Sequence, residues 1–113
     1  MDKSGHVQEK VYDVAWSGNR TPGADGKLPA VGSTVDIQDA TWTNTIGATE
    51  LIAVWKDPDF DPTQSAFYYG RVLEIPTPRW TAYDAKRFGI KPLPGTTMTL
   101  QERAYTSPIW YTP

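Results

Sequence analysis

The chain has 113 residues, a formal net charge of −2, 39% hydrophobic and 21% charged residues, and no cysteine. This composition indicates one globular domain and excludes disulfides and thiolate zinc sites. The acidic balance and the lack of any Lys or Arg run give no reason to expect nucleic-acid binding. No apolar run approaches the ~20 residues of a membrane-spanning helix, so we expect no membrane insertion.

The beginning of the chain offers little chemistry. The one histidine in the sequence is His6. Metal sites and Ser–His or Cys–His catalysis usually need a histidine in a rigid place, so we interpret His6 as a solvated terminal residue. The first residues are polar and do not resemble a signal peptide. If the protein is exported, we expect the signal to lie upstream.

The first half of the chain predicts short strands separated by turns. Residues 7–16 (VQEKVYDVAW) are rich in Val, Tyr and Trp, which favour a pleated strand. Residues 17–29 contain Gly, Asn, Pro and an Asp-Gly pair, which favour turns. They lack the alternating acidic residues of a calcium-binding loop. Further strands are expected at residues 31–37, 41–45 and 50–56.

An acidic loop follows at residues 57–63 (DPDFDPT). Asp57, Asp59 and Asp61 stand at alternate positions, which allows a weak cation site. The competing interpretation is a rigid surface turn, in which Asp side chains accept hydrogen bonds from nearby backbone N–H groups.

Residues 66–75 (AFYYGRVLEI) form the most strand-like stretch. Neither of its alternating faces is polar, and a strand with two apolar faces is usually covered on both sides. One face can pack on an opposing sheet, whereas the other needs a helix, a long loop or a partner domain. Tyr69 and Arg71 are therefore candidate interface residues. A buried Arg71 would need a partner such as Glu74.

Two prolines end this strand, and Arg79 and Trp80 follow them. This pair is a candidate interface or substrate-rim contact, with local packing as the alternative. The next residues predict a short helix at 81–89. Thr81 is a suitable N-cap with Asp84 three residues later, and Gly89 is a suitable C-terminal residue.

The end of the chain predicts a last strand at residues 104–111, interrupted or bulged at Pro108. Residues 96–102 are read as a loop or a short strand. About six short strands with turns between them predict an all-β fold. We expect an immunoglobulin-like or related antiparallel β-sandwich with one short helix near 81–89, as a single domain over residues 1–113.

No catalytic motif occurs in the sequence, and we expect no catalytic residue, metal or cofactor in this segment. The remaining signal is aromatic: five Trp, six Tyr and three Phe. Trp16, Trp55 and Trp110 are expected in the core. Exposed aromatic residues would instead stack on sugars or form a docking surface.

The stretches FYYGRVLEIPTPRW (67–80) and RAYTSPIWYTP (103–113) resemble the C-terminal end of the bacterial domain-of-unknown-function 3604 family. The segments VYDVAWSGNR, DGKLPAVGSTVD and VWKDPDFDP are similar to that family as well, so the resemblance covers nearly the whole chain. It implies a longer parent protein. The parent's main body resembles a PHP-type (polymerase and histidinol phosphatase) metal-dependent phosphoesterase, and a periplasmic or secreted location is favoured.

We therefore expect a non-catalytic C-terminal accessory domain that packs on an upstream catalytic body. The loop at 76–80 would reach the rim of the cleft, where Arg79 would meet an anionic substrate. The alternative is a binding module for carbohydrate or another cell-envelope ligand. If an upstream strand is missing, the open sheet edge can also pair with a second copy as a homodimer.

Overall fold

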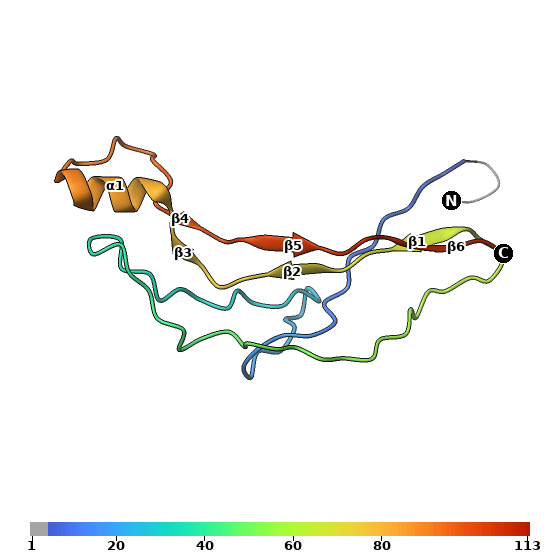
Figure 1. Ribbon diagram of the computed structural model, residues 1–113. Helices are drawn as coiled ribbons and strands as arrows, with labels where there is room; N and C mark the ends of the chain where they lie inside the picture. Colours follow the sequence, from blue (N-terminus) through green and yellow to red (C-terminus); the bar gives the residue numbers. More distant parts are fainter. Residues whose placement is uncertain (1–4) are drawn as a thin grey trace.

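A computed structural model describes residues 5–113 and contains a long two-stranded ribbon in the second half of the chain (Figure 1). The helix α1 (Trp80–Phe88) lies at one end of the ribbon and connects its two sides. Three antiparallel pairs follow one another along the ribbon: β1 (Ala66–Tyr68) with β6 (Ile109–Tyr111), β2 (Arg71–Leu73) with β5 (Arg103–Tyr105), and β3 (Thr77–Pro78) with β4 (Thr99–Leu100).

The two sides of the ribbon stay in register because two bulges compensate each other. Between the first two pairs, residues 69–70 lie opposite the three residues 106–108. Between the next two pairs, the three residues 74–76 lie opposite 101–102. Each longer side contains a proline, which cannot donate a ladder hydrogen bond. The interruption expected at Pro108 is confirmed.

The helix α1 begins directly from the last pair of the ribbon. Its N-cap is Arg79, in extended conformation and without a side-chain cap, so the predicted N-cap at Thr81 is wrong. The reason is that the Arg79 N–H already bonds the Met98 carbonyl oxygen at 2.9 Å, which carries the strand into the first turn. The Thr81 hydroxyl instead donates to the Thr97 carbonyl oxygen at 2.6 Å. The C-terminal Gly89 is confirmed, with φ 62°.

The N-terminal strap, residues 5–65, is almost entirely irregular. The strands expected at 7–16, 31–37, 41–45 and 50–56 do not form. Within this part of the chain the pairing is limited to one bridge, between Asp36 and Thr41. Pleated segments need a partner strand to satisfy their N–H and C=O groups, and the strap offers none alongside these residues.

The N-terminal strap runs along the ribbon to the helix and returns to β1 (Figure 1). At the helix end, the ammonium of Lys86 lies 3.3 Å from the Asp39 carboxylate and donates to the Asp39 carbonyl oxygen at 2.8 Å. Further along, Gly47 lies close to the side chain of Ile75. The strap is thus attached to the ribbon at separate points rather than through a continuous layer.

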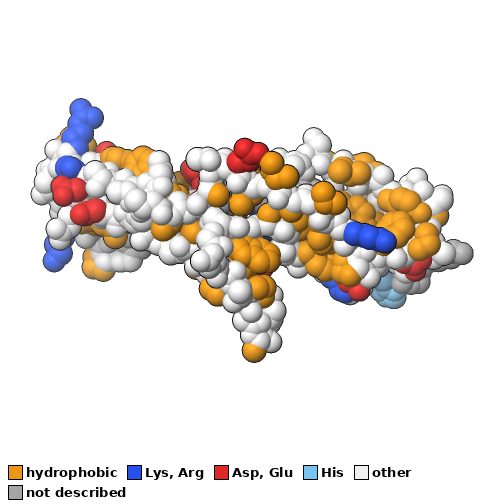
Figure 2. All heavy atoms as spheres, turned by 90° about the horizontal axis from the view of Figure 1, so that it is seen from below, with side chains coloured by type: hydrophobic (Ala, Val, Ile, Leu, Met, Phe, Trp, Pro, Cys, Tyr) orange, Lys and Arg blue, Asp and Glu red, His pale blue; other side chains and the backbone are white. Residues whose placement is uncertain are grey.

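The molecule is elongated and has almost no interior. Its radius of gyration is 19.2 Å, whereas about 13 Å is expected for a compact domain of this length. Its accessible area is 9413 Å², against about 6,200 Å² for a compact monomer of this mass. The buried hydrophobic residues among those described are Ala40 and Ala82. Figure 2 shows hydrophobic side chains spread over the length of one face.

The observed strands and exposures can be compared with the expected β-sandwich and its expected core tryptophans. The antiparallel strands with one short helix are confirmed. In residues 5–113 each sheet has two strands, and no second sheet lies over the ribbon. Trp55 and Trp110 are 39% and 71% exposed and Trp16 is half-buried, so their expected place in a core is wrong. A two-stranded ribbon cannot enclose such large side chains.

The contact between the strap and the ribbon at Gly47 gives a test of this arrangement. Gly47 has φ 83°, and a Cβ there would meet the Ile75 Cγ2 atom at 2.6 Å. We expect Gly47→Ala to cost about 1–2 kcal/mol for the backbone conformation alone, and more for the displaced Ile75. Gly32→Ala is the matched control, because Gly32 has φ 89° and open space around its Cα. Amide hydrogen exchange around each substituted position should show a larger loss of protection for Gly47→Ala, and equal losses would contradict the contact.

Candidate functional site

One face of the ribbon gathers aromatic and arginine side chains. The register pairs Phe67 with Trp110 and Arg71 with Tyr105, and paired residues share a face. Tyr69 links the two pairs, since its ring centroid lies 6.3 Å from that of Phe67 and 6.2 Å from that of Tyr105. We call this set the aromatic–arginine face: Phe67, Tyr69, Arg71, Arg103, Tyr105 and Trp110.

The opposite face of the ribbon is partly covered by the chain itself. Residues 55–62 of the strap lie against it. Trp55 meets the Tyr68 ring edge-on at 6.3 Å, and Phe60 meets the Tyr111 ring at 4.9 Å. The Tyr111 hydroxyl donates to the Pro62 carbonyl oxygen at 3.1 Å. We call this the covered face, and the strap therefore leaves the aromatic–arginine face as the more open one.

The three aspartates of the acidic loop are held by hydrogen bonds within the chain. Asp57 accepts from the Asp59 backbone N–H at 2.9 Å and from the Tyr68 hydroxyl at 2.8 Å. Asp61 accepts from the Thr63 N–H and hydroxyl, each at 2.8 Å. This is the geometry of the turn interpretation. Within residues 5–113 no group of three or more acidic or histidine side chains is arranged to hold a metal ion.

Asp59 connects the loop to the beginning of the strap. Its carboxylate lies 2.6 Å from the Lys10 ammonium and also accepts the Tyr12 hydroxyl. The hydrogen bond from Lys10, followed by that from Tyr12, lowers the pKa of Asp59 below 3.8. The same bond to Asp59, with a smaller effect of burial, raises the pKa of Tyr12 from 10.0 to about 12. The cluster is a crosslink between residues 47 to 49 positions apart in the chain.

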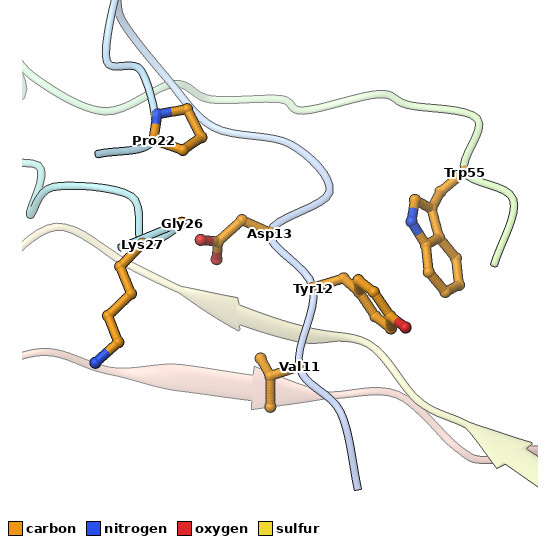
Figure 3. A pocket seen from close by; sticks show the side chains of 7 residues that line it. All are labelled: Val11, Tyr12, Asp13, Pro22, Gly26, Lys27 and Trp55. Carbon is orange, nitrogen blue, oxygen red and sulfur yellow. The ribbon is translucent and has the colours of Figure 1, made fainter. Parts of the chain in front are cut away.

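A hollow of about 520 Å³ lies beside this cluster (Figure 3). Its walls come from residues 11–13, the turn around Gly26, and Trp55, and the Asp13 carboxylate points towards that turn. The carboxylate accepts the Leu28 N–H at 3.4 Å. The lining contains one acidic and one basic side chain and no nucleophile with a base, so it has no recognisable catalytic set.

The structure places Arg79 and Trp80 at the helix end of the ribbon, away from the aromatic–arginine face (Figure 1). The Arg79 guanidinium lies 5.9 Å from the centre of the Trp80 ring. This is the geometry of a cation–π contact. The Trp80 side chain remains 63% exposed. Arg79 and Trp80 thus pack against each other, as the local-packing alternative expects. Their role at an interface or a substrate rim remains a prediction.

Arg71 and Tyr69 lie together on the aromatic–arginine face. Arg71 is exposed rather than buried, and within the described residues it forms no ion pair with Glu74. Tyr69 donates to the Glu9 carboxylate at 3.5 Å. The residues not anticipated from the sequence as site candidates are Phe67, Arg103, Tyr105 and Trp110. If the expected strands at residues 66–75 and 104–111 had been paired antiparallel, these four residues would have been placed close to Tyr69 and Arg71.

The sequence matches a known protein family along its whole length. The family model described as protein of unknown function (DUF3604) matches residues 1–113. The chain belongs to the DUF3604 family. No curated protein and no solved structure matches it significantly. Membership in the DUF3604 family confirms the resemblance carried by the ribbon sequences, while the family description assigns no activity. Over residues 5–113, no helix is long and apolar enough to cross a membrane.

The Asp59 cluster predicts a defined pH dependence. The lowered pKa of Asp59 contributes stability above about pH 4, and this contribution is lost as the pH falls through the folded-state pKa. The raised pKa of Tyr12 contributes below pH 10, and this contribution is lost as the pH rises through about 12. Asp59→Asn should therefore return the Tyr12 titration towards 10.0.

Tyrosine titration by ultraviolet absorbance or NMR measures this shift. Asp61→Asn serves as the matched control, because Asp61 bonds Thr63 and Gln64 rather than Tyr12. An unchanged Tyr12 titration in Asp59→Asn would disprove the crosslink.

Proposed function

We propose that this chain is a non-catalytic accessory part of a larger protein and completes its fold by packing on the catalytic body of that protein. The upstream body is a metal-dependent hydrolase of the PHP type, and the present residues form its C-terminal region. The PHP relationship, the C-terminal position and a periplasmic or secreted location come from the sequence resemblance. No metal or cofactor belongs to the accessory part itself.

The observation that supports this proposal is the missing interior. The accessible area of 9413 Å² exceeds that of a compact monomer by about 3,200 Å². A typical specific interface covers about 800 Å² per partner. The excess is about four times larger, which favours a permanent, extensive partner over a transient one. Many large hydrophobic side chains are at least 39% exposed, including Ile52, Val54, Leu93 and Ile109.

The β-sandwich predicted from the sequence would form, in this proposal, only when the ribbon packs on the body. Both long edges of the ribbon lack a neighbouring strand within residues 5–113. A two-stranded ribbon alone is marginal in water, whereas added strands and a second layer would stabilise it. The body would supply those strands, and the ribbon would contribute to one layer of the completed sandwich.

The 113-residue chain expressed alone tests the proposal. We expect it to bind the dye 8-anilinonaphthalene-1-sulfonate and to unfold without a sharp cooperative transition, because it buries too little apolar surface. The full protein should bind little dye and unfold cooperatively. A compact isolated chain, with a radius of gyration of about 13 Å by solution scattering and a sharp thermal transition, would refute the proposal.

The second candidate is a carbohydrate-binding module, favoured by the exposure of several aromatic rings, including Trp110 and Tyr105. Aromatic faces offer apolar platforms for sugar rings. We expect no signal on a glycan array for the full protein if the aromatic–arginine face is covered by the body. Binding that is lost in Trp110→Ala, and retained in Trp80→Ala as the control, would favour the carbohydrate module.

A further inference from the structure

We propose that the aromatic–arginine face is the surface that docks on the body, and that Arg71 and Arg103 together receive an Asp or Glu side chain of that body. The inference rests on the proposed function and names the surface and the chemistry that accomplish it. The proposed partner is an Asp or Glu carboxylate that lies within an apolar surface of the body.

The two arginines are neighbours on this face. The register pairs Arg71 with Tyr105 and Leu73 with Arg103, so the arginines lie diagonally across the ribbon. Diagonal neighbours lie about 7–8 Å apart, within reach of long side chains. Both arginines are exposed, and neither forms an ion pair within the described residues. Two exposed like charges at this separation repel each other weakly, and an anion between them removes that repulsion.

The surroundings of the arginines favour a protein partner. Tyr105 is 57% exposed, and Leu73 and Phe67 are half exposed on the same face. A guanidinium flanked by apolar rings binds a carboxylate through two parallel hydrogen bonds once water is excluded. Tyr, Trp and Arg are also the residues that contribute most binding energy at the centres of protein interfaces. A free small anion would leave the exposed aromatic rings in water.

The two faces of the ribbon also differ in how closely the strap packs against them. The covered face receives Trp55 and Phe60 of the strap. On the aromatic–arginine face, Tyr69 donates to Glu9 of the strap at the long distance of 3.5 Å. One side of the ribbon is thus packed from within the described chain, and the other is left for a partner.

Oxidative footprinting of the full protein tests which surface is docked. Each side chain is compared in the native and the urea-unfolded state. We expect Trp110 and Tyr105 to be strongly protected in the native protein. If they are modified as fast as in the unfolded state while Trp80 and Phe88 are protected, docking uses another surface and this inference fails, but the proposed function stands. If none of the four is protected, both fail.

Charge variants of the full protein test the carboxylate. Arg103→Glu should make native-state labelling of Trp110 about tenfold faster, as expected when a charge-assisted hydrogen bond is lost. Arg103→Lys keeps the charge and should have a smaller effect. Lys91→Glu is the matched charge control, because Lys91 is exposed beyond α1 and outside this face. Equal labelling rates in Arg103→Glu and Lys91→Glu would overturn the assignment of an acidic partner.

Discussion

The structure depends on the antiparallel pairing of two segments that are joined through a single short helix. The pairing satisfies backbone hydrogen bonds along β1, β2 and β3, but it provides only two strands. Side chains on the ribbon have neighbours along it, and on the covered face Trp55 and Phe60 of the strap also lie over Tyr68 and Tyr111, but no second sheet lies over the ribbon in residues 5–113. Ring contacts, turn hydrogen bonds and the strap each compensate locally for the missing layer. The free energy of folding therefore depends on what covers the ribbon.

The sequence was most informative where structure is local or paired within the chain. The apolar run at residues 66–75, the strand interrupted at Pro108 and the Gly89 helix end were all predicted, because each depends on nearby backbone preferences. The N-cap was predicted two residues too late, at Thr81 rather than Arg79, since the hydrogen bond from Arg79 to Met98 joins segments distant in sequence.

The strap and the site were harder to predict for a different reason. Residues 7–16 have the composition of a strand, but composition does not specify a pairing partner, and the described chain offers them none. Tyr69 and Arg71 were candidates from the two-faced pattern of their strand alone. Arg103 and Trp110 became part of the same surface only through the register, which a single sequence does not fix.

The positions of the prolines along the ribbon have a consequence for the chain before a partner covers it. Exposed apolar strands with open edges are ready templates for pairing with other molecules. Fibril-forming segments usually need six or seven regular residues without proline. Pro76 ends the apolar run on one side of the ribbon and Pro108 interrupts the other side, but residues 66–75 (AFYYGRVLEI) contain no proline. Without a partner, the ribbon therefore exposes one segment that is long enough to pair with other copies of the chain, and a partner that covers this strand would also protect the protein from aggregation.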